Sequence, residues 1–408
     1  MVRNPSGWPP GLRKMNYDIA IVGAGPAGLS FACSLANHGF RTAIVEQQPL
    51  PSIAEPAFDG RDIALTHLSV RILRELGAWA RIDESEISLI HEARVLNGSS
   101  PYSLDFDTQG EDIESLGYLV SNHVIRKALY DQAKEVEKLD LFNDAKVTSV
   151  TTDIDGACVT LSDGREINCS LVVAADSRFS DTRRMLGVPA SMHDFGRVCI
   201  VARMEHDLPN EGIAFECFHY GRTLAVLPLT ANQSSIVVTA AMSERNALME
   251  MTEQQFNQDI QSRFGSRYGT MRLITERFAY PLVAVHARKF CANRFALIGD
   301  AAVGMHPVTA HGFNLGLSGQ NVLAKAVIKA AKAGSDIGDK AVLERYESAH
   351  MRTTRPIYHG TNKIVKLFTD DRRPTRLIRA LTVRLANNFP PVKRVIRNKL
   401  TESRSINA

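Results

Sequence analysis

The sequence lacks any long uninterrupted apolar run. Although 44% of its 408 residues are hydrophobic, no window approaches the roughly 18 consecutive apolar residues that a membrane-spanning helix needs. Residues 1–14 also lack the apolar segment of a secretory signal, and we interpret them as a disordered leader or as a stretch upstream of the true start. These absences predict a cytoplasmic protein.

The chain also lacks paired cysteines. Its six cysteines include no CxxC pair, the spacing that is typical of zinc sites and of dithiol redox motifs. Each cysteine stands alone in apolar surroundings, as buried thiols do in proteins of a reducing compartment. We therefore expect no disulfide framework and no metal site.

A strong overall charge is missing as well, but the charge is unevenly distributed. The net charge is only +4, yet residues 352–404 hold 14 Lys and Arg and three acidic residues, a local balance of +11. Apolar residues recur there at helical spacing, and Pro374, Pro390 and Pro391 divide the region into short predicted helices. Basic amphipathic helices can lie on the anionic inner face of a membrane, although a helical cap with solvated charges explains the pattern equally well. Nucleic acid is not an expected partner, because no nucleic-acid-binding module accompanies the basic residues.

What the sequence does contain is the layout of a nucleotide-binding βαβ unit. A β-branched apolar run at 17–22 predicts a strand buried on both faces. An apolar helical pattern follows at 29–38, and Gly39 is expected to end it. A second buried strand is predicted at 42–45.

The loop after the first strand reads Gly23-Ala24-Gly25-Pro26-Ala27-Gly28. Gly23 permits a tight turn, Gly25 lets the backbone approach a diphosphate, and Gly28 allows close helix packing. Glu46, at the end of the second strand, can accept hydrogen bonds from ribose hydroxyls. We expect Gly23, Gly25, Ala27, Gly28 and Glu46 to bind a dinucleotide, and this unit alone leaves open whether it is FAD or NAD.

A second segment, at 293–317, favours a flavin. A predicted strand at 295–298 runs into Gly299-Asp300, and a proline-containing loop then leads to a long helix. The carboxylate of Asp300 can bind ribityl or ribose hydroxyls. The helix start, with Gly312, Phe313 and Asn314, presents free amides that suit negative charge on a reduced flavin.

In this order of motifs the chain resembles the class A flavin monooxygenases of the para-hydroxybenzoate hydroxylase type, and more closely the ubiquinone-biosynthesis ring hydroxylases. The resemblance runs from about residue 17 to 400. It implies an α/β fold with a Rossmann-like FAD-binding domain, an inserted substrate-binding sheet domain and a C-terminal helical region. The further motifs that carry it are Arg61 within 59–65, Arg126 within 122–129, Asp176 with Ser180 and Arg183, and the strand segments 227–229 and 280–282. By this resemblance Arg61, Arg126 and Asp176 are expected to contact FAD.

The resemblance also implies a division into domains. The expected ranges are a leader at 1–14, an FAD-binding domain at 15–94, 122–188 and 276–350, a substrate-binding domain at 95–121 and 189–275, and basic helices at 351–408.

The implied activity is hydroxylation of the aromatic ring of a polyprenylated phenol or quinol in ubiquinone biosynthesis, with O2 as co-substrate and a flavin hydroperoxide as the oxidant. NAD(P)H is the implied transient donor, because the chain has no second glycine-rich dinucleotide loop. A ubiquinone-biosynthesis complex is an implied partner. Three alternatives stay open: a hydroxylase of a small soluble phenol, a polyprenyl reductase, and a non-catalytic FAD scaffold.

Two histidines near the expected flavin edge, His306 and His311, are candidates for proton handling. A structural role is at least as good an explanation for His306. The chain also departs from the family pattern around the flavin, at Ser177 in place of glycine, Val303 in place of histidine, residues 309–311, and Gly319 in place of an acid.

Overall fold

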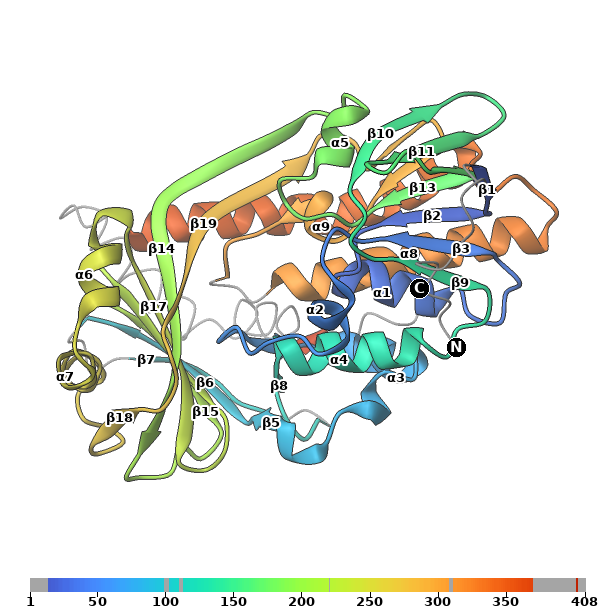
Figure 1. Ribbon diagram of the computed structural model, residues 1–408. Helices are drawn as coiled ribbons and strands as arrows, with labels where there is room; N and C mark the ends of the chain where they lie inside the picture. Colours follow the sequence, from blue (N-terminus) through green and yellow to red (C-terminus); the bar gives the residue numbers. More distant parts are fainter. Residues whose placement is uncertain are drawn as a thin grey trace.

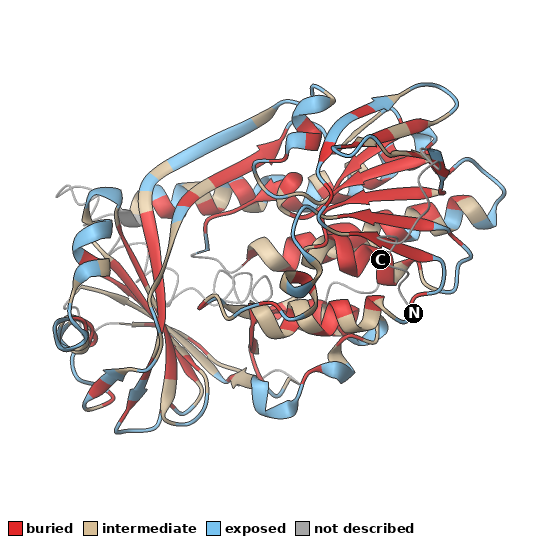
Figure 2. Cartoon of the chain, viewed as in Figure 1, coloured by how far each residue is buried: buried red, intermediate tan, exposed pale blue. Residues whose placement is uncertain are grey.

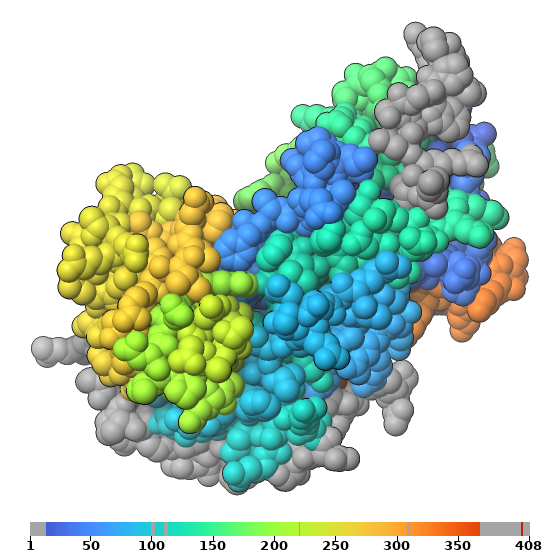
Figure 3. Space-filling view, turned by 60° about the horizontal axis from the view of Figure 1, so that its bottom comes forward, coloured from blue at the N-terminus to red at the C-terminus, as the bar shows by residue number. Residues whose placement is uncertain are grey.

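The computed structural model of the chain describes residues 14–98, 103–109, 113–219, 221–307, 311–369 and 401–402. Two large sheets organise these residues, one with six strands and one with nine (Figure 1). In the space-filling view, the yellow and gold lobe around α6 (Arg245–Glu250) and α7 (Glu253–Phe264) stands beside the blue and teal body built by the first part of the chain (Figure 3).

The six-stranded sheet is the nucleotide-binding core. Five of its strands are parallel, and the edge strand β20 is antiparallel to β21. Every residue of β2, β3 and β13 is buried, which explains why these strands read as continuous apolar runs (Figure 2). In sheet order the strands are β20 (Cys291–Ala292), β21 (Phe295–Leu297), β13 (Leu171–Ala174), β2 (Ile19–Val22), β3 (Thr42–Val45) and β9 (Leu139–Phe142).

Helices α1 (Pro26–Ser34), α4 (Asn122–Ala133) and α8 (His311–Lys332) lie together on one side of this sheet (Figure 1). Helix α1 is shorter than the predicted 29–38 pattern. After Ser34 the chain continues in single turns, and Asn37 has a left-handed backbone with φ of 62°. A residue in that conformation cannot continue a right-handed helix.

The nine-stranded sheet contains four strands, β14 to β17, from the range 189–275 in which a substrate-binding sheet was expected. The long strands β14 and β19 extend from it toward the six-stranded sheet (Figure 1), while α6 and α7 cover its outer face. Arg203 of β14 donates to Asp62 of β4, with Nη2 and Oδ1 2.6 Å apart, and ties the sheet to the nucleotide-binding part. In sheet order the strands are β22 (Val303–Gly304), β19 (Phe278–Ala287), β14 (Ala190–His206), β17 (Gln233–Ala241), β16 (Thr223–Pro228), β15 (Ile213–Phe218), β6 (Glu92–Asn97) and β7 (Ser103–Phe106), with β18 (Met271–Leu273) on β14.

Two smaller sheets complete the described fold. A three-stranded sheet connects the first part of the chain to α4, and a four-stranded sheet packs beside β13. Their strands are β4 (Asp62–Leu65), β8 (Gly117–Ser121) and β5 (Ile87–Ile90), and β1 (Lys14–Asn16), β12 (Glu166–Cys169), β11 (Ala157–Leu161) and β10 (Val147–Thr152). The remaining helices are α2 (Leu50–Ala54), α3 (His67–Glu75), α5 (Asp181–Met185) and α9 (Lys340–Thr369), with single 3-10 turns at Trp79–Arg81, Glu84–Glu86, Met242–Glu244 and Gly299–Ala301.

Several elements run across the expected domain boundaries. Strand β6 spans the boundary at 94/95, and β19 and β22 join the nine-stranded sheet although they follow residue 276. Strand β8, expected in the substrate-binding part, pairs with β4 and β5. Helix α9 continues through the boundary at 350/351, and the predicted helices at 370–400 lie outside the described residues. Among the helices that the structure describes, none combines the length and apolarity needed to cross a lipid bilayer.

Candidate functional site

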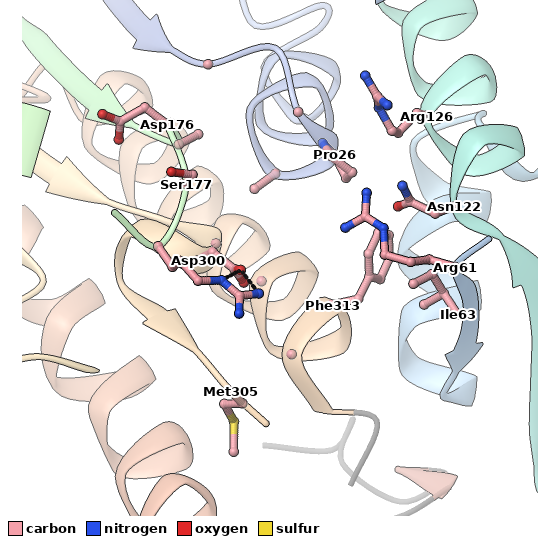
Figure 4. Close-up of a pocket in the computed structure, with 18 of the residues that line it drawn as sticks. Pro26, Arg61, Ile63, Asn122, Arg126, Asp176, Ser177, Asp300, Met305 and Phe313 are labelled. Atoms are coloured by element: carbon pink, nitrogen blue, oxygen red, sulfur yellow. Dashed lines mark hydrogen bonds and ion pairs between the residues drawn. The ribbon is translucent and has the colours of Figure 1, made fainter. Parts of the chain in front are cut away.

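One cavity of about 830 Å³ is lined by residues from both large sheets. On one side it is lined by loops at the carboxyl ends of β2, β3 and β13, and by the start of α8. On the other side it is lined by strands of the nine-stranded sheet. Ligands of open α/β sheets bind at the carboxyl ends of their strands. Figure 4 shows Asp176 and Ser177 on one side of this space and Asn122, Arg126 and Arg61 on the opposite side, with Pro26 between them.

The glycine loop has the geometry that its sequence predicted. Gly23 has φ of 107°, and a Cβ there would lie 2.6 Å from the carbonyl oxygen of Ala175. A Cβ on Gly28 would lie 2.0 Å from the carbonyl oxygen of Gly23, so only glycine allows this turn to pack on α1. At Gly25 no heavy atom lies within 4 Å of a Cβ, and Gly25 and Ala27 both line the cavity. The loop therefore offers its backbone to a ligand.

Glu46 lines the cavity directly after β3. Its Oε2 accepts a hydrogen bond from the amide of Ala24 at 2.7 Å, and its Oε1 accepts one from the amide of Gln48 at 2.9 Å. Each carboxylate oxygen has a second lone pair. The position therefore leaves room for Glu46 to accept ribose hydroxyls, and this role stays a prediction.

Two arginines supply positive charge to the cavity. Arg61 forms an ion pair with Asp59, and its guanidinium lies 5.3 Å from the ring centroid of Tyr280, whose hydroxyl donates to the carbonyl of Asp59. Arg126 donates to the carbonyl of Ser52, and within the described ranges no carboxylate forms an ion pair with it. Burial, and then the charge of Arg61, lowers the pKa of Arg126. An anionic ligand would compensate this desolvated charge.

The two acids predicted at the strand ends both reach the cavity. The Oδ2 of Asp176 accepts from the amide and hydroxyl of Thr182, at 3.0 and 2.8 Å. Its Oδ1 is buried and has no hydrogen-bond partner among the described residues. Asp300 accepts from Arg178 instead, with Nη2 and Oδ2 2.8 Å apart (Figure 4).

At the start of α8 the expected residues have different surroundings. Gly312 and Phe313 line the cavity, and a Cβ on Gly312 would have no heavy atom within 4 Å. Asn314 is not among the described lining residues. Its side chain accepts from the amide of Thr66 and donates to the carbonyl of Ala64, so it joins α8 to the segment between β4 and α3.

The two candidate histidines also differ. His306 is buried, lines the cavity and packs edge-on against Phe195, with ring centroids 4.8 Å apart. Burial, and then the charge of Arg197, lowers the pKa of His306 to about 4, so its imidazole is neutral at pH 7. His311 is the first residue of α8 and is buried, but it is not among the described residues that line the cavity.

Val303, one of the departures from the family pattern, lies in a buried strand. Val303 is buried in β22, where it pairs with His286 of β19. A histidine at this position would bring a second imidazole beside His286. Thr309 and Ala310, which belong to another departure, lie outside the described residues.

The strands of the nine-stranded sheet form one wall of the cavity, which we call the sheet wall. The sequence analysis named none of the individual residues in this wall. The wall is apolar apart from two threonines and one acid. In the sequence, the one feature that could have identified a residue of this wall is Glu216, which interrupts the apolar strand 213–218. The lining residues from these strands are Glu216, Phe218, Thr223, Ala225, Leu227, Val237 and Thr239.

These features fit a dinucleotide such as FAD. Backbone open to the cavity at Gly25 and Gly312 can meet a diphosphate and an anionic ring. The buried Oδ1 of Asp176 and the buried charge of Arg126 are groups that a polar ligand would satisfy. Gly23, Gly25, Ala27, Glu46, Arg61, Arg126, Asp176, Asp300, Gly312 and Phe313 share this one cavity. Gly28 contributes through packing and Asn314 through its contacts with the neighbouring segment.

Comparison with known proteins gives the same result. A family model described as an FAD binding domain matches residues 16–356. Ubiquinone hydroxylase UbiM of Neisseria meningitidis serogroup C is 45% identical over 391 residues, which cover 95% of this chain and 85% of that protein. Ubiquinone hydroxylase UbiL of Rhodospirillum rubrum is 32% identical over 378 residues, 93% of this chain and 88% of that protein. In fold, p-nitrophenol 4-monooxygenase PnpA from Pseudomonas putida DLL-E4 is similar with a TM-score of 0.76 at 17% identity, over 95% of this chain and 99% of that one.

The predicted α/β fold with a Rossmann-like FAD-binding part is confirmed by the parallel sheet and by this similarity. The family model spans most of the chain, and two relatives exceed 30% identity over more than nine-tenths of it. The chain therefore belongs to the FAD binding domain family, and within it to the FAD-dependent aromatic-ring monooxygenases.

Proposed function

We propose that this chain hydroxylates the aromatic ring of a polyprenylated phenol or quinol in ubiquinone biosynthesis. The observation that carries the proposal is the single cavity in which dinucleotide-binding loops and an apolar sheet wall face the same space. A ring held against that wall would lie beside the cofactor. The ubiquinone hydroxylases among the relatives support this choice of substrate.

The residues of the chain would bind, orient and shield, while FAD, when bound, supplies the activation of O2. The glycine loop and Arg126 would hold the diphosphate, and Glu46 and Asp300 would accept hydrogen bonds from sugar hydroxyls. The apolar wall would exclude water from the reacting ring. His306, as a neutral imidazole in the cavity, is the proposed proton-handling residue, and His311 at the start of α8 is the second candidate.

The electron donor and the cellular context are further parts of the proposal. NAD(P)H is the proposed transient donor, because the sequence contains one glycine-rich dinucleotide loop. The concentration of positive charge at 352–404 supports contact with an anionic membrane surface, where a polyprenylated substrate would partition. Such a location is also compatible with a ubiquinone-biosynthesis complex.

The experiment is mass spectrometry of quinones from a bacterium that lacks its own ring hydroxylases and expresses this chain. We expect oxygenated intermediates, and the modified positions would define the regioselectivity. If only the unhydroxylated precursor accumulates although the protein is made and carries FAD, the ubiquinone substrate is wrong. Repeating the experiment with ¹⁸O2 separates hydroxylation from reduction, because only hydroxylation incorporates the label.

A further inference from the structure

One carboxyl group stands in the otherwise apolar part of the sheet wall. Glu216 of β15 lies opposite Ala225 of β16, Ala225 lies opposite Val237 of β17, and Val237 lies opposite Val201 of β14. Residues directly opposite each other in antiparallel strands share one face of a sheet. Four strands therefore contribute a row of three apolar side chains and one acid.

Alternation along β15 directs this acid toward the cavity. Phe215 and Cys217, its neighbours in sequence, belong to the core on the other face, together with Phe256 and Phe264 of α7. Successive side chains of a strand point to opposite faces. Glu216 accordingly lines the cavity, beside Phe218 of the same strand.

The described residues supply no counter-charge for this carboxyl group. Throughout the described part of the chain, no ion pair and no hydrogen bond is made by the Glu216 side chain. Burial raises its pKa to about 8, so the group is largely protonated at neutral pH. A buried polar group without a partner lowers the stability of the fold. The position therefore suits a ligand that carries its own hydrogen-bonding group.

We propose that the carboxyl group of Glu216 binds the oxygen substituent of the substrate's aromatic ring, and so fixes which ring carbon faces the cofactor. This inference rests on the proposed function. A protonated carboxyl can donate to a ring oxygen through its hydroxyl and accept from a ring hydroxyl through its other oxygen. The apolar side chains of Ala225, Leu227 and Val237 line the same cavity and are suited to the ring and its hydrocarbon chain. Glu216 would thus be a substrate-binding residue that determines specificity.

The first test measures binding to the FAD-loaded protein by the change in flavin absorbance. The probes are 2-geranylphenol and geranylbenzene, which differ only in the ring hydroxyl. We expect the unmodified protein to bind the phenol at least about tenfold more tightly. Glu216→Leu should remove this preference by weakening the phenol alone, whereas Glu216→Gln, which can still donate and accept, should retain most of it. Glu205→Leu, at an exposed acid of β14 in the same sheet, is the matched control and should bind both probes as the unmodified protein does.

The second test separates a binding role from a structural one. The raised pKa of Glu216 means that its contribution to stability is present below about pH 4.5 and is lost as the pH rises to about 8. The titratable groups that interact with it are the thiols of Cys199 and Cys217, and burial raises the pKa of each to about 12, so both stay neutral in this range. The Glu216→Gln holoenzyme should therefore melt higher than the unmodified protein at pH 7.5, by about 3 °C or more, and equally at pH 4.5. If Glu216 instead stabilised the fold, the Glu216→Gln protein would melt at a lower temperature than the unmodified protein at pH 7.5.

These results are independent of whether ubiquinone precursors are the substrate. A Glu216→Leu protein that still prefers the phenol, or a Glu216→Gln protein that melts lower at pH 7.5, would overturn the inference. A lack of preference in the unmodified protein would overturn it as well. The proposed function is tested by a separate experiment. It fails if cells that make the unmodified protein contain no ¹⁸O-labelled quinone.

Discussion

The imidazole of His350 occupies the space that a side chain at position 319 would need. A Cβ built on Gly319 of α8 would lie 2.5 Å from Nε2 of His350 in α9. His350 is only 3% exposed, and it packs against Tyr346 and Phe290 with ring centroids 5.8 and 5.4 Å away. The packing of these two helices thus leaves no room for a side chain at position 319 unless His350 moves.

This packing predicts that Gly319→Ala destabilises the protein. The added methyl group would displace a buried ring, and overpacking of this kind costs about 1–3 kcal/mol. Gly360→Ala in α9 is the matched control, because no heavy atom lies within 4 Å of a Cβ there. The control should gain up to about 1 kcal/mol from helix propensity. Urea unfolding measures both variants, and equal stabilities for the two would contradict the steric explanation.

His350 also makes stability depend on pH. Burial, and then the charge of His286, lowers the pKa of His350 to about 4, against roughly 6.5 in an unfolded chain. Between these values the unfolded chain binds a proton that the folded chain excludes. The stabilisation is therefore complete above about pH 6.5 and is lost as the pH falls toward 4.

The expected loss from this one group is about 3 kcal/mol at pH 4, since one pKa unit corresponds to about 1.4 kcal/mol. Melting curves between pH 7 and pH 4.5 measure it. His350→Gln should flatten the dependence only in part, because the pKa of His306 is lowered to about 4 as well. If the melting temperature of His350→Gln falls with pH as steeply as that of the unmodified protein, His350 does not titrate between pH 7 and pH 4.5.

The backbone conformation of Ser177 predicts a gain in stability when glycine replaces it. Ser177, which follows Asp176, has φ of 99°. A side chain in such a conformation costs about 1–3 kcal/mol, so Ser177→Gly should raise the free energy of unfolding by about 1 kcal/mol. Ser191→Gly, at an exposed position of β14, should instead lower it by about 0.5–1 kcal/mol. Thermal unfolding of the two variants should therefore shift in opposite directions, and a lower melting temperature for Ser177→Gly would refute the strain.

The nucleotide-binding part could be predicted because its signals are local. The runs at 17–22 and 42–45 are dominated by apolar residues, and the strands within them, Ile19–Val22 and Thr42–Val45, are buried at every position, as strands covered on both faces are. Gly28 is explained by a contact with Gly23 within one turn, and Glu46 follows its strand directly. Each of these features depends on residues that are close in sequence.

The sheet wall could not be predicted in the same detail, because its pairings are long-range. Strand β15 pairs in parallel with β6, so that Ile213 lies opposite Glu92. No local pattern specifies a partner more than a hundred residues away. The direction of Glu216 into the cavity follows only once α7 is known to cover the other face. Asn314 shows the same difficulty, since its hydrogen bonds reach Thr66 and Ala64 of a distant segment.

The last prediction concerns Asp300, whose carboxylate faces the cavity and pairs with Arg178. Asp300→Ala should weaken FAD retention about tenfold or more, because it removes a charged acceptor for sugar hydroxyls and leaves Arg178 without its partner. The measurement is flavin absorbance per protein after desalting, followed by titration with FAD. Asp163→Ala, which removes an exposed acid paired with Arg165, is the matched control and should retain FAD fully.

Arg178→Ala distinguishes the two causes of this loss. If Asp300 binds FAD directly, Arg178→Ala should retain more FAD than Asp300→Ala, because the acceptor is still present. Equal losses in both variants would mean that the ion pair only holds the loop in place. An Asp300→Ala protein that purifies with its full flavin content would contradict the assignment of Asp300 to the cofactor altogether.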